Sequence, residues 1–231
     1  MYKLLLFMMG VFFTNFVSGG VTLDRTRVVL FTDEMKQSMS LVNLNDYPVY
    51  VQLWIGDDEN DNPDKVDSPL IVLPSTLQLV NQEKSVISLM NLRPKQKLVD
   101  EKMFWLHINE VPAIKDNDVT ARESSSVRIG MKTLYKVFLR PRKLGSLTFT
   151  NVIGKVTCVL NGKGVDISNK SDFHLSIVSL SVYTKNEYVF EVGKTLIPRG
   201  QIKVLSNLNN VKRMRVNMLD DSGTLMKVDC N

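Results

Sequence analysis

The side chains most often used in catalysis are scarce in this chain. It has two histidines, His107 and His174, and each lies in an apolar, strand-like run, as packed or surface histidines usually do. The sequence contains neither the GxSxG pattern that presents a nucleophilic serine nor the HExxH pattern of zinc hydrolases. We therefore expect no catalytic site, no cofactor and no metal ion, and we predict that the protein is not an enzyme.

One acidic segment, DDENDNPDKVD at residues 57–67, has a composition similar to that of a calcium-binding loop. A loop beginning at Asp58 would need glycine at its sixth position and glutamate at its twelfth. Pro63 and Pro69 occupy those two positions, so an EF-hand is excluded. The segment is better interpreted as a solvated acidic loop.

The N-terminal segment MYKLLLFMMGVFFTNFVSGG has the pattern of a cleaved secretory signal peptide. One cation, Lys3, precedes an apolar stretch from Leu4 to Val17, and small residues follow. The alternative is a membrane anchor, but the apolar stretch is shorter than the roughly 20 residues that a spanning helix needs. We predict a signal peptide over residues 1–20, with cleavage near Gly19 or Gly20.

The two cysteines, Cys158 and Cys230, both follow this segment. Export would bring them into an oxidising compartment, where an even number of cysteines favours pairing. We therefore expect a disulfide between them, and two buried thiols remain the alternative.

The charge pattern argues against a nucleic-acid partner. The net charge is +5, but the lysines and arginines are interspersed with acidic residues. Nucleic-acid-binding chains usually concentrate cations in runs or interleave them with aromatic residues.

The sequence predicts that the secondary-structure elements positioning any site are short strands. Six segments rich in β-branched and aromatic residues, separated by turn-forming clusters, occur before residue 113: VTLDRTRVVLF, QSMSLVNL, YPVYVQLWIG, LIVLPSTLQLV, KSVISLMNL and MFWLHINEV. A second set follows RPRKLG at residues 140–145 and begins with SLTFTNV and KVTCVLNG. We predict an all-β protein with a first domain at residues 21–140, a hinge at 141–145 and a second domain at 146–231. Immunoglobulin-like β-sandwiches are the expected architecture for domains of this size.

Several of these segments resemble blocks of one family, the periplasmic chaperones of the bacterial chaperone–usher pathway. They include VTLDRTRVVLF near the mature start, EKMFWLHINEVPA at residues 101–113, KTLYKVFLRP at 132–141, and TLIPRGQ and LDDSGT in the second domain. The blocks follow the family's order along essentially the whole mature chain.

The resemblance implies two immunoglobulin-like domains in an L or boomerang arrangement, preceded by the signal peptide. It implies a periplasmic chaperone that folds and caps fimbrial or pilus subunits lacking their last strand. The chaperone lends them a strand, which is the donor-strand form of β-augmentation. It then delivers them to an outer-membrane usher. The exposed apolar row on the lent strand would also allow free copies to self-associate.

The resemblance also assigns roles to particular residues. Arg27 and Lys136 match the two cations that hold a subunit's C-terminal carboxylate in the interdomain cleft. Val127, Ile129 and Met131 match the apolar positions of the donor strand. Glu101, Arg140 and Asp221 match an ion-pair network that orients the domains, although Asp220 fits the local pattern as well as Asp221.

The stretch SSSVRIGMKTLYKVFLRP, Ser124–Pro141, contains both the donor and the anchor positions. We expect Val127–Met131 to face a partner and Leu134–Phe138 to pack within its own domain. Strict alternation puts Lys136 on the face opposite Met131, and a bulge or strong twist near Thr133 would reconcile the two roles.

A second hypothesis remains open from the sequence. A secreted immunoglobulin-like adhesin or binding module would equally account for the signal peptide and the sandwiches. It would not account for a donor-patterned strand leading into the hinge, nor for two cations meeting in one cleft.

Overall fold

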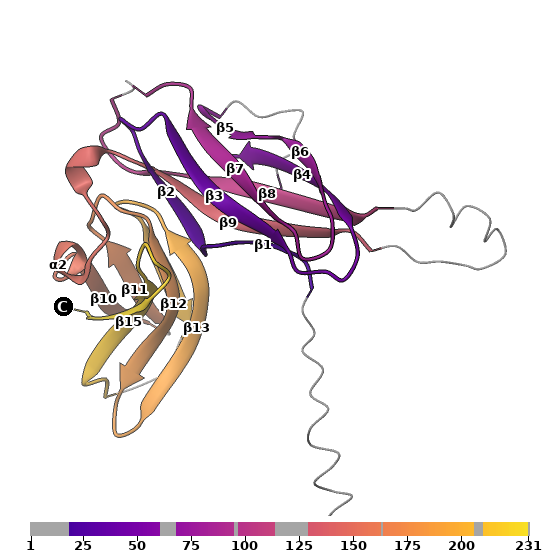
Figure 1. The fold of residues 1–231 in the computed structure, drawn as a ribbon. Coiled ribbons are helices and arrows are strands. Elements are labelled where there is room, and N and C mark those ends of the chain that lie inside the picture. Colours follow the sequence, from indigo (N-terminus) through magenta and orange to yellow (C-terminus); the bar gives the residue numbers. More distant parts are fainter. Residues whose placement is uncertain are drawn as a thin grey trace, which may run out of the picture.

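The computed structural model describes residues 19–60, 68–94, 97–113, 129–162, 164–205 and 210–230. These residues form strands almost throughout, arranged in two bodies that meet at an angle (Figure 1). The predicted all-β class with two sandwiches in an L arrangement is confirmed. Within the described ranges no helix is long and apolar enough to cross a membrane. The predicted signal peptide lies outside them except for Gly19 and Gly20.

The first domain contains two sheets. In chain order its strands are β1 (Val21–Leu23), β2 (Arg27–Phe31), β3 (Lys36–Asn43), β4 (Val49–Gly56), β5 (Leu70–Leu73), β6 (Thr76–Leu79), β7 (Lys84–Asn91), β8 (Lys102–Pro112) and β9 (Met131–Arg140). One sheet has the order β1-β3-β7-β5 and the other has the order β2-β9-β8-β4-β6.

The core of this domain follows from the period of two along each strand. In β4, Val49, Val51, Leu53 and Ile55 are each at most 2% exposed, and the residues between them point outward. Because successive side chains of a strand alternate between the faces of the sheet, one row of β-branched and aliphatic residues is buried per strand. The same alternation in β3 and β7 supplies the facing layer of the core.

Two of the segments predicted as single strands each divide between the two sheets. VTLDRTRVVLF breaks at residues 24–26, so that β1 pairs with β3 while β2 pairs with β9. LIVLPSTLQLV breaks at Pro74, so that β5 pairs with β7 while β6 pairs with β4. Proline has no backbone N–H for a continuous ladder, which explains why the second segment cannot stay in one sheet.

The second domain follows a short connection, a 3₁₀ turn η3 (Arg142–Leu144). Its elements are α2 (Phe149–Val152), β10 (Val156–Asn161), β11 (Gly164–Asn169), β12 (Leu175–Tyr183), β13 (Glu187–Leu196), β14 (Gln201–Leu205), β15 (Arg213–Leu219) and β16 (Leu225–Asp229). The sheets have the orders β10-β11-β14 and β13-β12-β15-β16, and they enclose a core that begins at Leu147.

The segment SLTFTNV was expected to be a strand, and that expectation is wrong. Phe149–Val152 is one turn of α-helix, begun by a capping box in which Thr148 and Asn151 each bond the other's backbone. A Thr or Ser followed three residues later by a side chain that bonds back satisfies the exposed N–H groups of a helix start. The capping box therefore explains why this short apolar run forms a helical turn and not a strand.

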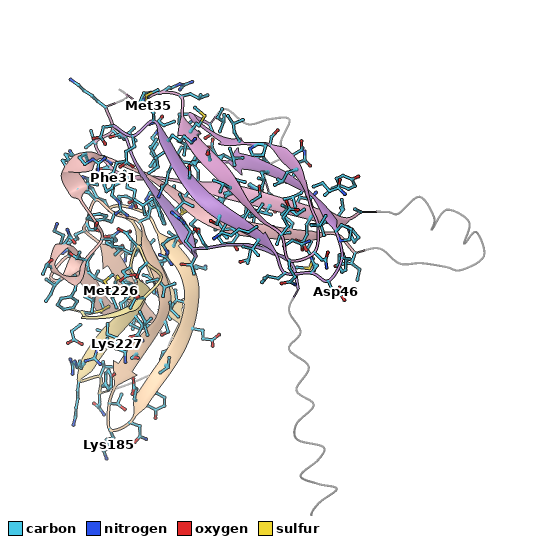
Figure 2. All side chains as sticks on the ribbon, viewed as in Figure 1. Phe31, Met35, Asp46, Lys185, Met226 and Lys227 are labelled. Carbon is cyan, nitrogen blue, oxygen red and sulfur yellow. A yellow bond between two sulfur atoms is a disulfide. The ribbon has the colours of Figure 1, made fainter. Side chains whose placement is uncertain are left out.

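The two ends of the first domain have different surroundings. Figure 2 shows Phe31 near the connection to the second domain and Asp46 at the opposite end. Strand β9 runs between these ends, since it pairs with β2 up to Phe31 and with β8 from Glu110 onward.

Candidate functional site

Arg27 and Lys136 come together where the two domains meet. Strands β2 and β9 are parallel, and in their register Arg27 and Lys136 are direct partners. Their neighbours Val28 and Val137 are fully buried in the core, so both cations project from the opposite face of the sheet. Arg27 Nη1 donates to the carbonyl of Leu219 in β15 at 3.4 Å, which places the pair beside the second domain.

Arg27 is buried, and Lys136 is half-buried. Arg27 is 7% exposed, and its Nε has no hydrogen-bond partner among the described residues. Burial lowers the pKa of Arg27, although Asp221 and Asp220 oppose this shift. Burial, reinforced by the charge of Arg27, also lowers the pKa of Lys136, and Glu59 opposes it. Each shift means that the charged form is less favourable here than in water.

The space beside Lys136 is formed by both domains. A cavity of about 380 Å³ is lined by the acidic residues 57–59 and Trp105 from the first domain, and by residues 193–195 of β13 from the second. Lys136 Nζ lies 5.6 Å from the centroid of the Trp105 ring, in cation–π contact.

Strand β9 is paired on both sides for only part of its length. It pairs with β8 from Met131 to Leu139, but with β2 only from Lys136 to Arg140. Within the described ranges, the stretch Met131–Tyr135 therefore has a paired strand on one side only. An unpaired edge of this kind offers N–H and C=O groups to an incoming strand.

The predicted donor positions lie at the start of this edge. Ile129 is 71% exposed and Met131 is 43% exposed, whereas Val127 lies outside the described residues. The β8–β9 register is continuous from Glu110–Met131 to Lys102–Leu139, so of the two alternatives suggested for Thr133, a bulge or a strong twist, the bulge is absent from this described stretch. Met131 therefore shares a face with the core residues Val137 and Leu139, and Lys136 lies on the other face.

This arrangement changes how the second half of β9 is interpreted. Phe138 was expected to pack within its own domain, but its ring lies 5.9 Å from that of His174 in the second domain. One face of β9 thus covers the core of the first domain, and the other faces the interdomain junction. Val137 and Leu139 on one face are buried in the core of the first domain, and Phe138 on the other face is buried at the junction. Strict alternation along β9 therefore accounts for both faces without a change of register.

A buried ion-pair network joins the domains at the end of β9. Arg140 is 1% exposed and binds Glu101 through Nε and Asp221 through two parallel bonds of 2.6 and 2.7 Å. A bidentate bond to a guanidinium fixes both distance and orientation. Asp220 instead accepts the backbone N–H groups of Ser222 and Thr224 in its own turn, so Asp221 is the residue in the network.

His174 is a member of this network that the sequence did not reveal. Its backbone N–H donates to Glu101 Oε1 at 2.8 Å, and its Nδ1 lies 3.1 Å from the same oxygen. His107, by contrast, lies within the first domain, where it stacks on Trp54 with ring centroids 4.7 Å apart. In the sequence each histidine lies in an apolar run, so the two look alike. They differ in the structure because His174 belongs to the second domain and contacts Glu101 of the first, whereas His107 stacks on a residue of its own domain.

Cys158 and Cys230 form a disulfide in the structure. It connects β10 of one sheet to the residue that follows β16 of the other, so it links the two layers of the second sandwich. Within the described ranges no group of three or more His, Cys, Asp or Glu side chains is placed to hold a metal ion.

Comparisons with known proteins show the family of this chain. A family model described as the pili and flagellar-assembly chaperone, PapD N-terminal domain, matches residues 20–145. Among curated relatives, the chaperone protein PmfD of Proteus mirabilis is 26% identical, over 90% of this chain and 82% of that protein. The chaperone protein PapD of Escherichia coli is also 26% identical, over 88% of this chain and 84% of that protein.

Solved structures share the fold at lower identity. The Escherichia coli chaperone DraB gives a TM-score of 0.74 at 19% identity, covering 92% of this chain and 98% of that one. The Salmonella enterica SafA pilin in complex with the SafB chaperone gives a TM-score of 0.74 at 17% identity, covering 91% and 95%. The family model spans more than half of the sequence, and this protein therefore belongs to the pili and flagellar-assembly chaperones with a PapD N-terminal domain.

Proposed function

We propose that this protein is a periplasmic chaperone that binds pilus subunits along the open edge of β9 and holds their C-terminal carboxylate between Arg27 and Lys136. The observation that carries the proposal is the position of the two cations. Lys136 is the first β9 residue paired with β2, so the cations stand where the open edge ends.

This position sets the direction and register of the bound strand. A subunit strand lying beside Met131–Tyr135 would continue the line of β2 and reach Arg27 and Lys136 with its last residue. It would therefore run parallel to β9. Fixing the carboxylate prevents a slip by one residue, which would turn every side chain of the strand to the wrong face.

The apolar side chains add the donor function. Met131, Ile129 and Val127 occupy alternate positions, so they would enter the open core of the subunit together. Since Met131 is in line with Val137 and Leu139, the core of the subunit would extend the core of the first domain. Each side chain could contribute roughly 1.5–3 kcal/mol if fully buried.

The remaining parts of the proposal follow from the same mechanism. Glu101, Arg140 and Asp221 keep the domains at the angle that forms the cleft. Binding and release need no chemical step, so the protein acts without a cofactor and is not an enzyme. After export through the predicted signal peptide, it would deliver its subunits to an outer-membrane usher. The solved SafA pilin–SafB chaperone complex supports the choice of a pilus subunit as partner.

Lys136 and Lys132 provide a matched pair for testing the anchor. Both project from the same face of β9, and Lys132 also lies over a tryptophan, at 5.5 Å from the Trp54 ring centroid. The chaperone is co-expressed with a subunit from a neighbouring gene, and the yield of the 1:1 complex is measured. Lys136→Ala should abolish recovery while Lys132→Ala preserves it, and equal yields would refute the anchor.

A further inference from the structure

Glu110 is a buried carboxylate outside the site described above. It lies near the end of β8, on the core face that it shares with Ile108 and Leu106, and it is 4% exposed. Asp46, which follows the Asn45 that contacts Glu110, marks this end of the domain in Figure 2, far from the connection at Phe31. The network at Arg140 is therefore too distant to balance its charge.

Glu110 contacts the start of the folded chain and the loop residue Asn45. Its Oε2 accepts the backbone N–H of Val21, and its Oε1 lies 3.5 Å from Asn45 Nδ2. Within the described ranges no lysine, arginine or histidine side chain forms an ion pair with it. A buried carboxylate is costly unless a positive charge or several donors compensate it.

Gly20 is the residue at which the chain enters the domain. Gly19 is exposed, while Gly20 is buried, donates its N–H to Asn45 Oδ1 at 2.8 Å and accepts the N–H of Leu44 at 3.0 Å. Its φ of +90° favours glycine, and a Cβ atom there would lie 3.0 Å from the terminal carbon of Met131. The match to the family model begins at the same residue.

We propose that the mature protein begins at Gly20 and that its α-ammonium group is the missing positive charge for Glu110. This inference rests on the proposed export. Backbone nitrogens of adjacent residues are at most about 4 Å apart. Since Val21 N contacts Glu110 directly, a charge on Gly20 N lies within about 6 Å of the carboxylate, where opposite charges interact strongly. One ammonium hydrogen would bond Asn45 Oδ1, and the others would face Glu110.

The ion pair would couple processing to the binding site. Before cleavage the nitrogen of Gly20 is a neutral amide, so the carboxylate has no positive partner at that position. After cleavage the charge fixes β1 against β8, directly beside Met131. The base of the donor segment would thus be completed when the signal peptide is removed.

The first test uses the wild-type protein purified from the periplasm. Intact-mass and N-terminal peptide analysis should show Gly20 as the first residue. The α-amine is then acetylated at neutral pH, and its rate should be at least about tenfold slower in the native than in the urea-denatured protein, corresponding to a pKa raised by about one unit. Equal rates would overturn the proposal.

Variants test whether Glu110 is the cause. Glu110→Gln should raise the native acetylation rate toward the denatured value, while Asp46→Asn, which removes an exposed carboxylate next to Asn45, should leave it unchanged. If Glu110→Gln fails to fold, a chain with one extra alanine before Gly20 replaces it, and its melting temperature should fall below that of the wild type. An unchanged melting temperature would count against the proposal.

The outcomes also separate this proposal from the one on which it rests. A periplasmic protein that retains residues 1–18 would overturn both the signal peptide and the ion pair. A protein cleaved at another bond, or one with a freely reactive α-amine, would overturn only the ion pair.

Discussion

Arg27 and Lys136 are register partners in a parallel strand pair, although they come from opposite ends of the first domain's sequence. Parallel pairing aligns the start of β2 with the middle of β9. The two cations therefore mark the point where β9 changes from an open edge to a strand paired on both sides. In the proposed function, this coincidence of charge and edge would allow one site both to bind a chain end and to set its register.

The lowered pKa of Lys136 predicts how binding depends on pH. A carboxylate is held only while the lysine is protonated, so affinity for a subunit should fall as pH rises through a value below the usual 10.5. The Lys136→Arg variant should keep its affinity to higher pH because a guanidinium stays charged. Dissociation constants measured between neutral pH and pH 11 test this, and identical profiles for the two proteins would argue against it.

The free protein should show the opposite trend in the same pH range. The folded state binds the Lys136 proton less tightly than the unfolded state. In the window between the lowered pKa and 10.5 the unfolded chain therefore holds more protons, so the contribution of Lys136 to the free energy of unfolding rises with pH. Comparing urea denaturation of the wild type and Lys136→Met at several pH values isolates this contribution.

The buried network predicts a large loss of stability when Arg140 is truncated. Arg140→Ala leaves Glu101 without its cation and should lower the free energy of unfolding by about 3–5 kcal/mol. Arg142→Ala is the matched control, because its bonds to Asp33 and Glu34 are exposed and should contribute far less than the buried network. The measurement is urea denaturation, combined with small-angle scattering to follow the interdomain angle.

The same experiment has a clear negative outcome. If both variants unfold at the wild-type urea concentration and give the same scattering curve, the network neither stabilises nor orients the domains.

The disulfide predicts a second stability effect, confined to the second domain. Cys158 and Cys230 are 72 residues apart in sequence. Closing a loop of that length restricts the unfolded chain and contributes about 4 kcal/mol in the chain-entropy model. The Cys158→Ser, Cys230→Ser double variant should lose about that much in urea denaturation. Mass spectrometry that finds two alkylatable thiols in the unreduced periplasmic protein would contradict the pairing.

Much of the fold could be predicted because alternation and turn residues are local signals. The strands β3, β4, β7 and β8 lie where their apolar periodicity placed them. The division of two segments between sheets, at residues 24–26 and at Pro74, depends on which strands stand opposite, and that is not a local property. The helical turn at Phe149–Val152 was missed because a short apolar run has no clear period.

The site residues likewise fall into those that the sequence predicted and those that it did not. Arg27 and Lys136 were found through the family resemblance, since nothing in their spacing indicates that they are neighbours. Trp105, Leu219 and His174 were missed because they contact the predicted residues only through strand pairing or the second domain. Strict alternation correctly placed Met131 and Lys136 on opposite faces of β9, and of the two suggested ways to reconcile their roles, a bulge or a strong twist, the bulge is absent from the described stretch.

The most direct test of the central claim is hydrogen exchange along β9 in the free chaperone and in its complex with a subunit. Among the backbone amides of Met131–Tyr135, those that point away from β8 should exchange more slowly in the wild-type complex, while the amides of Lys136–Arg140, which lie between β8 and β2, should change little. When Lys136→Ala is mixed with the same subunit, the protection of Met131–Tyr135 should be lost. A wild-type complex in which the open-edge amides of Met131–Tyr135 exchange as fast as in the free protein would contradict strand donation by β9.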